Sequence, residues 1–184
     1  MSKHGSAGAR QTAQKSDGRL SADELHTITS HLAVQEDLWR PQVVHDRAAR
    51  WHSQLLWSPQ VEIWLIGWHA GQDLDLHDHG GASGAFTVCE GTIEVRQGSS
   101  SQPYDEVRQR TLRKGDTVTF DGEYIHEVAN RYTTPATTIH AFSPALATMG
   151  YYETVAGELI VARRETMGAP EPSVVATPVA AGRA

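Results

Sequence analysis

The stretch Gly71-Gln-Asp-Leu-Asp-Leu-His77-Asp-His79-Gly-Gly-Ala-Ser-Gly84 places two histidines two positions apart, before a glycine-rich bend. In a β-strand, residues i and i+2 point to the same face of the sheet. Two imidazoles that point together into a barrel can hold one metal ion, and neutral imidazole binds iron, copper, nickel and zinc. Because histidines are also common on protein surfaces, the rest of the chain has to decide between a metal site and two surface residues.

Length and composition limit the class of protein. The chain has 184 residues, 39% of them hydrophobic, which suits one domain with a sizeable core. The net charge of -6 argues against nucleic-acid binding, which normally needs a basic surface. Cys89 is the only cysteine, which excludes an intrachain disulfide and a cysteine-rich zinc site. The cysteine usage gives no evidence of an oxidising compartment, so we expect a cytoplasmic protein. The N-terminus has no apolar core of signal-peptide length and no run is long enough to cross a bilayer, so we expect no membrane partner.

Both ends of the chain have the composition of disordered segments. Residues 1–20 are rich in Gly, Ser, Ala, Gln and Lys without an apolar period, and residues 168–184 are rich in Pro and Ala. Residues 21–167 therefore form a single predicted domain.

The predicted domain begins with a helix. Ser21 is a good N-cap residue, and Glu24 completes a capping box. An apolar stripe continues to Val34, and Pro41 ends the helical pattern. We expect this helix to pack on the outside of the main domain.

From Arg50 onward the pattern changes to short β-rich runs that are separated by Gly, Pro, Asn and Asp. Many short strands at even spacing are typical of a sandwich or a barrel. The predicted strands cover 51–57, 61–70, 85–90, 92–97, 107–112, 116–120, 126–130 and 136–142, with a last hairpin over 149–155 and 158–163.

A second segment, Gly115-Asp-Thr-Val-Thr-Phe-Asp-Gly-Glu-Tyr-Ile-His126-Glu-Val-Ala-Asn130, repeats the glycine turn, short strand, second turn and histidine. The two segments resemble the cupin motifs G-x5-H-x-H-x3,4-E-x6-G and G-x5-P-x-G-x2-H-x3-N. The resemblance implies an all-β cupin barrel (a double-stranded β-helix or jelly roll) with an N-terminal helical segment. The matching residues are Gly71, His77, His79 and Gly91 in the first motif, and Gly115, His126 and Asn130 in the second. The metal ligands implied are His77, His79 and His126.

The glutamate of the first motif falls on Gly84, so this ligand is missing. Three neutral histidines leave positions open on the metal and leave its positive charge uncompensated. Such a centre favours an anionic substrate such as a thiolate and keeps a place for dioxygen, as in the open triad of non-haem iron oxygenases. A closed site with four ligands would instead suit structural zinc.

A closer resemblance covers residues 50–144. The run His77-Asp-His79-Gly-Gly-Ala-Ser-Gly-Ala-Phe, preceded by Trp-x-x-Gly-Gln, resembles the bacterial thiol dioxygenases of the cysteine dioxygenase family. This resemblance implies an enzyme that holds Fe(II) with three histidines and converts a small thiol to its sulfinic acid with O2. In Thr138-Ile-His140-Ala-Phe142, His140 matches a histidine beside the metal in the family's Ser-x-His-x-Tyr motif. His140 is thus the expected catalytic residue, which would position the substrate or the oxygen.

The chain departs from the family at the substrate-binding positions. Phe142 replaces the family tyrosine, and Gly84 replaces the cysteine that crosslinks to this tyrosine in animal enzymes. The carboxylate-binding arginine aligns with Ser53 or Gln54, and Gln54 would lack the bidentate ion pair of arginine. These departures make cysteine one candidate thiol beside 3-mercaptopropionate and similar thiols. The expected substrate-binding residues are Arg50, Gln54, Tyr124 and Phe142.

Two other functions are compatible with the sequence: a metal-dependent cupin enzyme that acts on a non-thiol substrate, and a non-catalytic cupin that binds a small ligand. No helix-turn-helix pattern supports a transcriptional regulator. We expect a monomer. We also expect Cys89 to fill the core, together with Trp51, Trp57, Trp64 and Trp68. We expect His52 to lie on the surface, and Asp78 to be solvated or to orient a neighbouring ligand.

Overall fold

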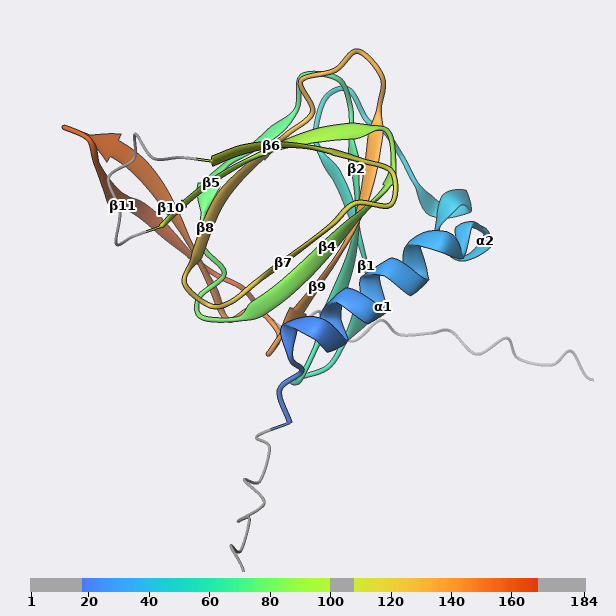
Figure 1. Ribbon diagram of the computed structural model, residues 1–184, viewed down its shortest axis with the longest axis horizontal. Coiled ribbons are helices and arrows are strands. Elements are labelled where there is room, and N and C mark those ends of the chain that lie inside the picture. The colour runs from blue at the N-terminus through green and yellow to red at the C-terminus, as the bar shows by residue number, and fades with distance from the viewer. Residues whose placement is uncertain (1–17, 100–107, 169–184) are drawn as a thin grey trace, which may run out of the picture.

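A computed structural model describes residues 18–99 and 108–168, and within them two antiparallel sheets close into a cupin barrel (Figure 1). The predicted tails at 1–20 and 168–184 lie outside the described residues, apart from 18–20 and 168. The five-stranded sheet has the order β1-β2-β9-β4-β7, and the six-stranded sheet has the order β11-β10-β3-β8-β5-β6. The all-β cupin fold expected from the two motifs is therefore confirmed.

The strands follow the predicted pattern closely, because each run carries its own alternation and ends at a turn residue. β3 was not among the predicted strand ranges. It is a short strand that includes the first histidine of the His-x-His pair. In chain order the strands are β1 Trp51–Trp57, β2 Glu62–Trp68, β3 Asp73–His77, β4 Ser83–Glu90, β5 Thr92–Ser99, β6 Arg108–Arg113, β7 Thr117–Phe120, β8 Tyr124–Ala129, β9 Ala136–Ser143, β10 Thr148–Val155 and β11 Glu158–Thr166.

Helix α1, Ala22–Val34, lies outside the barrel against β4, β9 and β7, as expected (Figure 1). The predicted capping box is present: Ser21 Oγ accepts a hydrogen bond from Glu24 N at 3.3 Å, and Glu24 Oε2 accepts one from Ser21 N at 2.8 Å. Val34 is 77% exposed, so the predicted apolar stripe is wrong at its end. The buried positions of α1 recur every four residues, which turns position 34 toward solvent. Helix α2, Glu36–Trp39, and the 3-10 turn η1, Arg40–Gln42, continue the chain toward β1.

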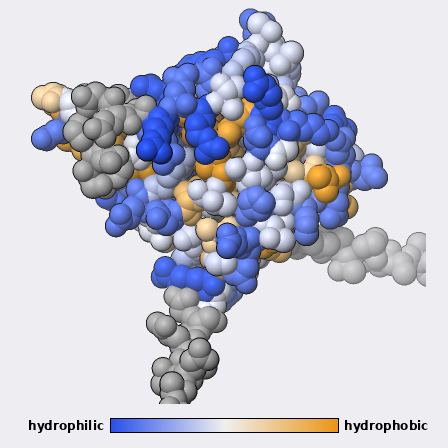
Figure 2. Space-filling model, in the orientation of Figure 1, coloured by the Kyte–Doolittle hydropathy of each residue, from blue (hydrophilic) through white to orange (hydrophobic). Residues whose placement is uncertain are grey.

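Two hydrophobic cores hold the domain together. One fills the barrel between the sheets and includes Trp68, Phe86 and Ile93. The other lies between α1 and the outer face of the five-stranded sheet and includes Leu25 and Cys89. Cys89 is thus a core residue, as expected, and burial raises the pKa of its thiol to about 12. In Figure 1 the strands form a ring. Figure 2, seen from the same side, shows that side chains fill the space within this ring and that both hydrophobic and hydrophilic residues are visible there.

Candidate metal centre

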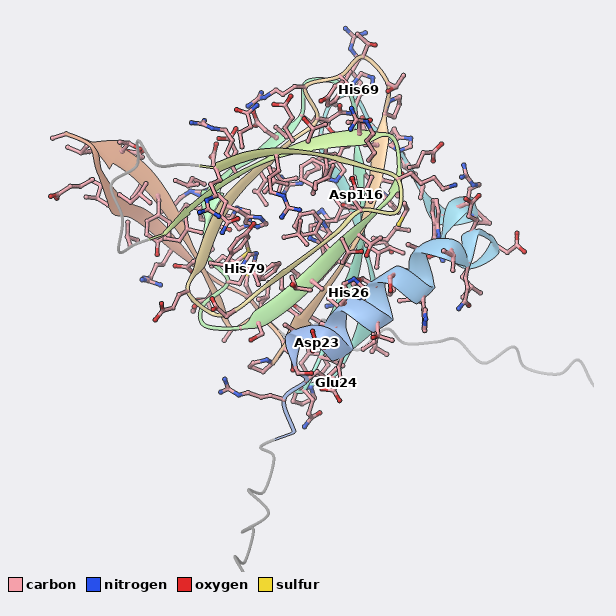
Figure 3. All side chains as sticks on the ribbon, in the orientation of Figure 1. Asp23, Glu24, His26, His69, His79 and Asp116 are labelled. Carbon is pink, nitrogen blue, oxygen red and sulfur yellow. The ribbon has the colours of Figure 1, made fainter. Side chains whose placement is uncertain are left out.

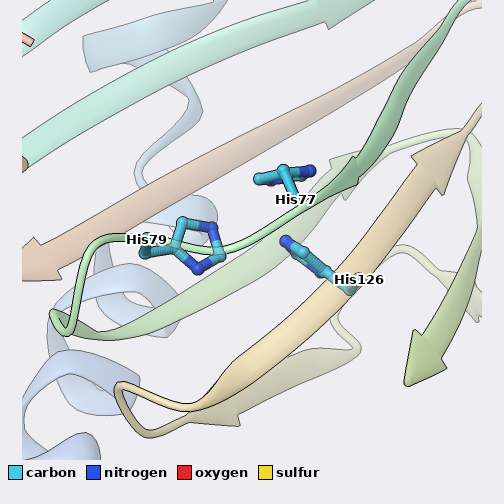
Figure 4. Close-up of side chains that lie close together, drawn as sticks. All are labelled: His77, His79 and His126. Carbon is cyan, nitrogen blue, oxygen red and sulfur yellow. The ribbon is translucent and has the colours of Figure 1, made fainter. Parts of the chain in front are cut away.

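Three histidines meet inside the barrel. His77 is the last residue of β3, His79 follows it in the chain, and His126 lies on β8, the strand that pairs with β3. Their ligand atoms all lie within 4.8 Å of one another, and the three rings face one common point (Figure 4). In Figure 3, His79 lies inside the ring of strands, whereas His26 lies on α1 outside it. The structure thus brings together the three predicted ligands.

The convergence of His77 and His79 does not come from strand alternation, because β3 ends at His77. His79 belongs to a bend in which Ala82 N donates to His79 O at 3.1 Å. Gly80 and Gly81 have φ angles of 60° and 87°, a backbone conformation that residues with a side chain rarely adopt. A side chain at Gly80 would also place its Cβ 2.5 Å from Thr148 O. The prediction that both histidines lie on one strand face is therefore wrong, although they do converge.

The environment keeps all three ligands uncharged at neutral pH. His77, His79 and His126 are each at most 2% exposed. Burial lowers the pKa of His77 to about 4 and holds the pKa values of His79 and His126 well below the usual range. A metal needs the unprotonated nitrogen of a neutral imidazole, so burial prepares these residues to bind one.

Hydrogen bonding shows which atoms are available to a metal. His77 Nδ1 donates a hydrogen bond to Asp75 O at 2.7 Å. The other ring nitrogen of His77, Nε2, is therefore the one that can coordinate a metal. The Nδ1 atoms of His79 and His126 are buried without a hydrogen-bond partner. A buried polar atom without a hydrogen-bond partner destabilises the folded protein, unless a bound ion or molecule takes the place of the partner. Three imidazoles without a carboxylate fit a divalent transition metal such as Fe(II), with positions left open.

A cavity of about 240 Å³ opens onto this cluster. His77, His79, His140, Arg50 and Phe142, all predicted site residues, are part of its wall. Much of the remaining wall is apolar or aromatic and comes from β2 and from the segment 146–151. The cavity can therefore hold a small molecule beside a metal, with one cationic side chain within it.

His140 and Phe142 reach the cavity from β9, where both are buried. His140 Nε2 lies 2.8 Å from Thr138 Oγ1, and Thr138 Oγ1 also accepts a hydrogen bond from Trp68 Nε1 at 2.8 Å. Burial lowers the pKa of His140 to about 3. His140 is therefore a neutral, hydrogen-bonding side chain at neutral pH.

Arg50 immediately precedes β1, and its side chain lines the cavity. Its guanidinium lies over the Trp68 ring, 5.1 Å from the ring centroid, and Nη1 donates to Asp73 O at 3.0 Å. Its Nε atom is buried without a hydrogen-bond partner. Burial lowers the pKa of Arg50, but a guanidinium stays protonated in proteins.

Two other predicted substrate-binding residues are placed differently. Gln54 Nε2 donates to Glu62 Oε2 at 3.2 Å, and Glu62 Oε1 also accepts from Leu146 N at 3.1 Å. Tyr124 stacks on Phe120, with ring centroids 4.9 Å apart, and lies 4.8 Å from the His126 ring. Neither Gln54 nor Tyr124 is part of the cavity wall.

The structure adds wall residues that the sequence did not single out. His52, expected on the surface, is exposed but borders the cavity, with its ring 5.5 Å from that of Trp64. Trp64 and Trp68, expected to be core, also line the cavity. Arg50 and His52 are two positions apart, a spacing that puts both side chains on one side of an extended segment, and this was the signal that could have suggested this role for His52.

Asp78, between the two histidines, is 8% exposed, so the expectation of a solvated carboxylate is wrong. Its carboxylate accepts hydrogen bonds from Gly80 N at 2.8 Å, Gly150 N at 3.1 Å and the hydroxyl of Tyr152. These donors lower the pKa of Asp78 and outweigh the opposing effect of burial. The carboxylate therefore ties the metal-binding bend to β10.

The barrel and the three-histidine cluster define a cupin with a candidate metal centre. The family model described as cysteine dioxygenase type I matches residues 12–155. The chain belongs to this family. No curated protein sequence gives a significant match.

Solved structures share the fold. A conserved protein with a double-stranded β-helix domain from Klebsiella pneumoniae subsp. pneumoniae MGH 78578 is 19% identical, with a TM-score of 0.52 over 73% of this chain and 96% of that one. The protein TT1209 from Thermus thermophilus is 20% identical, with a TM-score of 0.50 over 58% of this chain and 93% of that one. At these identities the likeness supports the fold alone.

Within the described ranges, no helix is both long enough and apolar enough to cross a bilayer.

Proposed function

We propose that this protein is an Fe(II)-dependent thiol dioxygenase that oxidises a small thiol to its sulfinic acid with O2. The observation that carries the proposal is the set of three buried, neutral histidines without a carboxylate, in a chain of the cysteine dioxygenase type I family. The reaction balances as RSH + O2 → RSO2H, so it needs no further reductant.

The metal ligands would be His77, His79 and His126. Bound ferrous iron would supply a site for the thiolate and for the redox chemistry with dioxygen. Since no described carboxylate belongs to the cluster, a thiolate would provide the negative charge that a fourth protein ligand would otherwise supply.

The protein would contribute binding and orientation. The largely apolar wall limits the access of water to the reacting sulfur. His140 would hydrogen-bond the bound thiol as the catalytic residue, and Phe142 would pack against it. Arg50 would bind an anionic group of the substrate from its position inside the cavity. Gln54 and Tyr124 would act from outside the wall, Gln54 through Glu62 and Tyr124 through its contact with His126.

Oxygen uptake tests the proposal. Protein loaded with Fe(II) without air would be given L-cysteine, cysteamine, 3-mercaptopropionate and larger thiols, and sulfinate would be detected by mass spectrometry. We expect oxygen uptake that depends on a thiol and equals the sulfinate formed. Zinc-loaded protein is the matched control, because zinc has no redox chemistry.

A different result would redirect the proposal. If iron-loaded protein consumes no oxygen with any thiol, the thiol dioxygenase proposal fails, and a cupin that acts on a non-thiol substrate or only binds a ligand takes its place. A monomeric state and a cytoplasmic location stay predictions; size-exclusion chromatography with light scattering tests the first.

A further inference from the structure

Two methionine side chains lie in the wall of the cavity at the candidate metal centre. The chain has three methionines and one cysteine. Met149 and Met167 both line the cavity, and Met1 lies outside the described residues. Cys89 belongs to the other core, between α1 and the five-stranded sheet, and does not line the cavity. Both internal methionines therefore border the space in which a metal would carry out oxygen chemistry.

The pairing of β10 with β3 places Met149 next to the metal ligands. Tyr151 on β10 lies opposite His77, and the backbone N–H that follows His77 donates to Gly150 O at 2.9 Å. Because the two segments run antiparallel, the next position brings Met149 opposite His79. Met149 and Tyr151 are two residues apart and share one face of β10, the face that lines the cavity.

The two methionines differ in their access to solvent. Met149 is 8% exposed, whereas Met167 is only partly buried. Met167 follows the end of β11, and its N–H donates to Ala147 O at 2.9 Å. An oxidant in bulk water should therefore react with Met167 first. An oxidant activated at the three histidines should instead react with Met149 first, so the order of reaction reveals where the oxidant is activated.

A thioether accepts an oxygen atom from hydrogen peroxide. In the step R–S–CH3 + H2O2 → R–S(O)–CH3 + H2O, the O–O bond breaks, an S–O bond forms, and two electrons pass from sulfur to the peroxide. Bound ferrous iron would supply the redox chemistry that accelerates this transfer. The sulfoxide is polar, so within a largely apolar wall it would disturb packing and lack a hydrogen-bond partner.

We propose that Met149 is a modification site: without a bound thiol, peroxide activated at the metal centre oxidises Met149 to its sulfoxide, which weakens thiol binding in the cavity. A bound thiol would occupy the cavity and protect the methionine. Reductases of methionine sulfoxide would restore the thioether, so the modification is reversible. This inference goes beyond the proposed function, because it needs a redox-active metal on the three histidines but no thiol oxidation.

Peptide mass spectrometry tests the site without any turnover. Protein loaded with Fe(II) without air and without thiol would receive a stoichiometric amount of hydrogen peroxide, followed by catalase. We expect Met149 to gain one oxygen at least about tenfold faster than Met167, because the oxidant is activated beside it. In zinc-loaded protein, the matched control, Met167 should react first, because zinc has no redox chemistry. Equal rates at Met149 in the iron and zinc forms overturn the proposal.

Iron free in solution also activates peroxide, and one variant separates this effect from the metal centre. His126→Ala protein with the same total iron should oxidise Met167 before Met149, because the variant lacks one ligand of the centre. In wild-type protein, Cys89 in the other core should stay unmodified. Preferential oxidation of Met149 in folded His126→Ala protein would overturn the role of the centre.

Met149→Leu tests the effect on binding, because leucine keeps a similar apolar volume without sulfur. After peroxide treatment of the iron form, the metal would be exchanged for zinc, and the protein would be titrated calorimetrically with 3-mercaptopropionate. We expect oxidised wild-type protein to bind at least about tenfold more weakly than untreated protein, and treated Met149→Leu protein to keep the affinity of its untreated form. Unchanged binding by oxidised wild-type protein, or an equal loss in Met149→Leu, overturns this effect.

The two proposals fail separately. If iron-loaded protein consumes no oxygen with any thiol but oxidises Met149 in an iron-dependent way, the proposed function fails and the modification site stands. If thiol-dependent oxygen uptake occurs but Met149 reacts no faster with iron than with zinc, the modification site fails and the proposed function stands.

Discussion

Gly84 on β4 lies directly opposite Phe142 on β9. These are the two positions at which the family resemblance would place a cysteine and a tyrosine. A Cβ at position 84 would lie 2.3 Å from Phe120 Cζ, so the Phe120 ring occupies the space that a side chain would need. The two departures thus form one cross-strand pair, and Phe120 completes the packing between them.

We expect Gly84→Ala to lower the free energy of unfolding by about 1–3 kcal/mol, because the Phe120 ring would have to move within a packed core. Urea denaturation measures the change. Gly98→Ala is the control: its Cβ would meet no atom closer than 3.5 Å, so its effect should be below about 0.5 kcal/mol. Phe120→Leu in the Gly84→Ala background should recover part of the loss. Equal effects of the two alanine variants would contradict the steric argument.

The Tyr152 hydroxyl on β10 donates to the Asp78 carboxylate between two candidate metal ligands. We expect Tyr152→Phe to weaken metal binding by about tenfold, in the range found for groups that orient metal ligands. Titration of metal-free protein with cobalt measures this affinity. Tyr132→Phe is the control, because it removes a hydroxyl from a remote contact with Glu94. A lower melting temperature of the metal-free protein with unchanged metal affinity would show that Tyr152 is merely structural.

His126 is nearly fully buried and faces the other two histidines. His126→Ala should weaken metal binding by more than about 100-fold, since even groups that only orient ligands are worth about 10–100-fold. Metal analysis after dialysis, with circular dichroism to verify the fold, measures the loss. His31→Ala on α1 is the control. A folded, active His126→Ala protein that retains iron would exclude the three-histidine centre.

The buried histidines predict how stability depends on pH. Burial lowers the pKa of His77 to about 4 and that of His140 to about 3, whereas the pKa of a histidine in the unfolded chain is about 6.5. Between these values the unfolded chain binds protons that the folded chain does not. The free energy of unfolding of metal-free protein should therefore fall as pH falls, by up to about 1.4 kcal/mol per pH unit for each such histidine.

Urea denaturation between about pH 5 and 6.5, where most carboxylates remain ionised, measures this slope. His140→Gln removes one titrating group and should reduce the slope by up to about 1.4 kcal/mol per pH unit. Gly98→Ala, which changes no titrating group, should leave it unchanged. The same slope in wild-type and His140→Gln protein would mean that the folded state protonates His140 at an ordinary pKa.

The parts of this protein that depend on local spacing could be predicted from its sequence. The Ser21 and Glu24 cap, the strand runs and the two histidine segments each carry their signal within a few neighbouring residues. The motif spacing also predicted which histidines meet, because the cupin topology pairs β3 with β8. Alternation along a strand nevertheless gave the wrong reason for the position of His79, which depends on the bend after β3.

Contacts between distant segments were decided only by the tertiary structure. The register of β1 against β2 shifts between Gln54 and Leu56, and Gln54 bonds to Glu62 while Arg50 enters the cavity. Asp78 is buried because β10, much later in the chain, brings Gly150 and Tyr152 to it. The sequence by itself therefore determined the barrel and the histidines that converge. The tertiary structure decided which polar groups surround them, because burial and hydrogen bonding depend on which strands become neighbours.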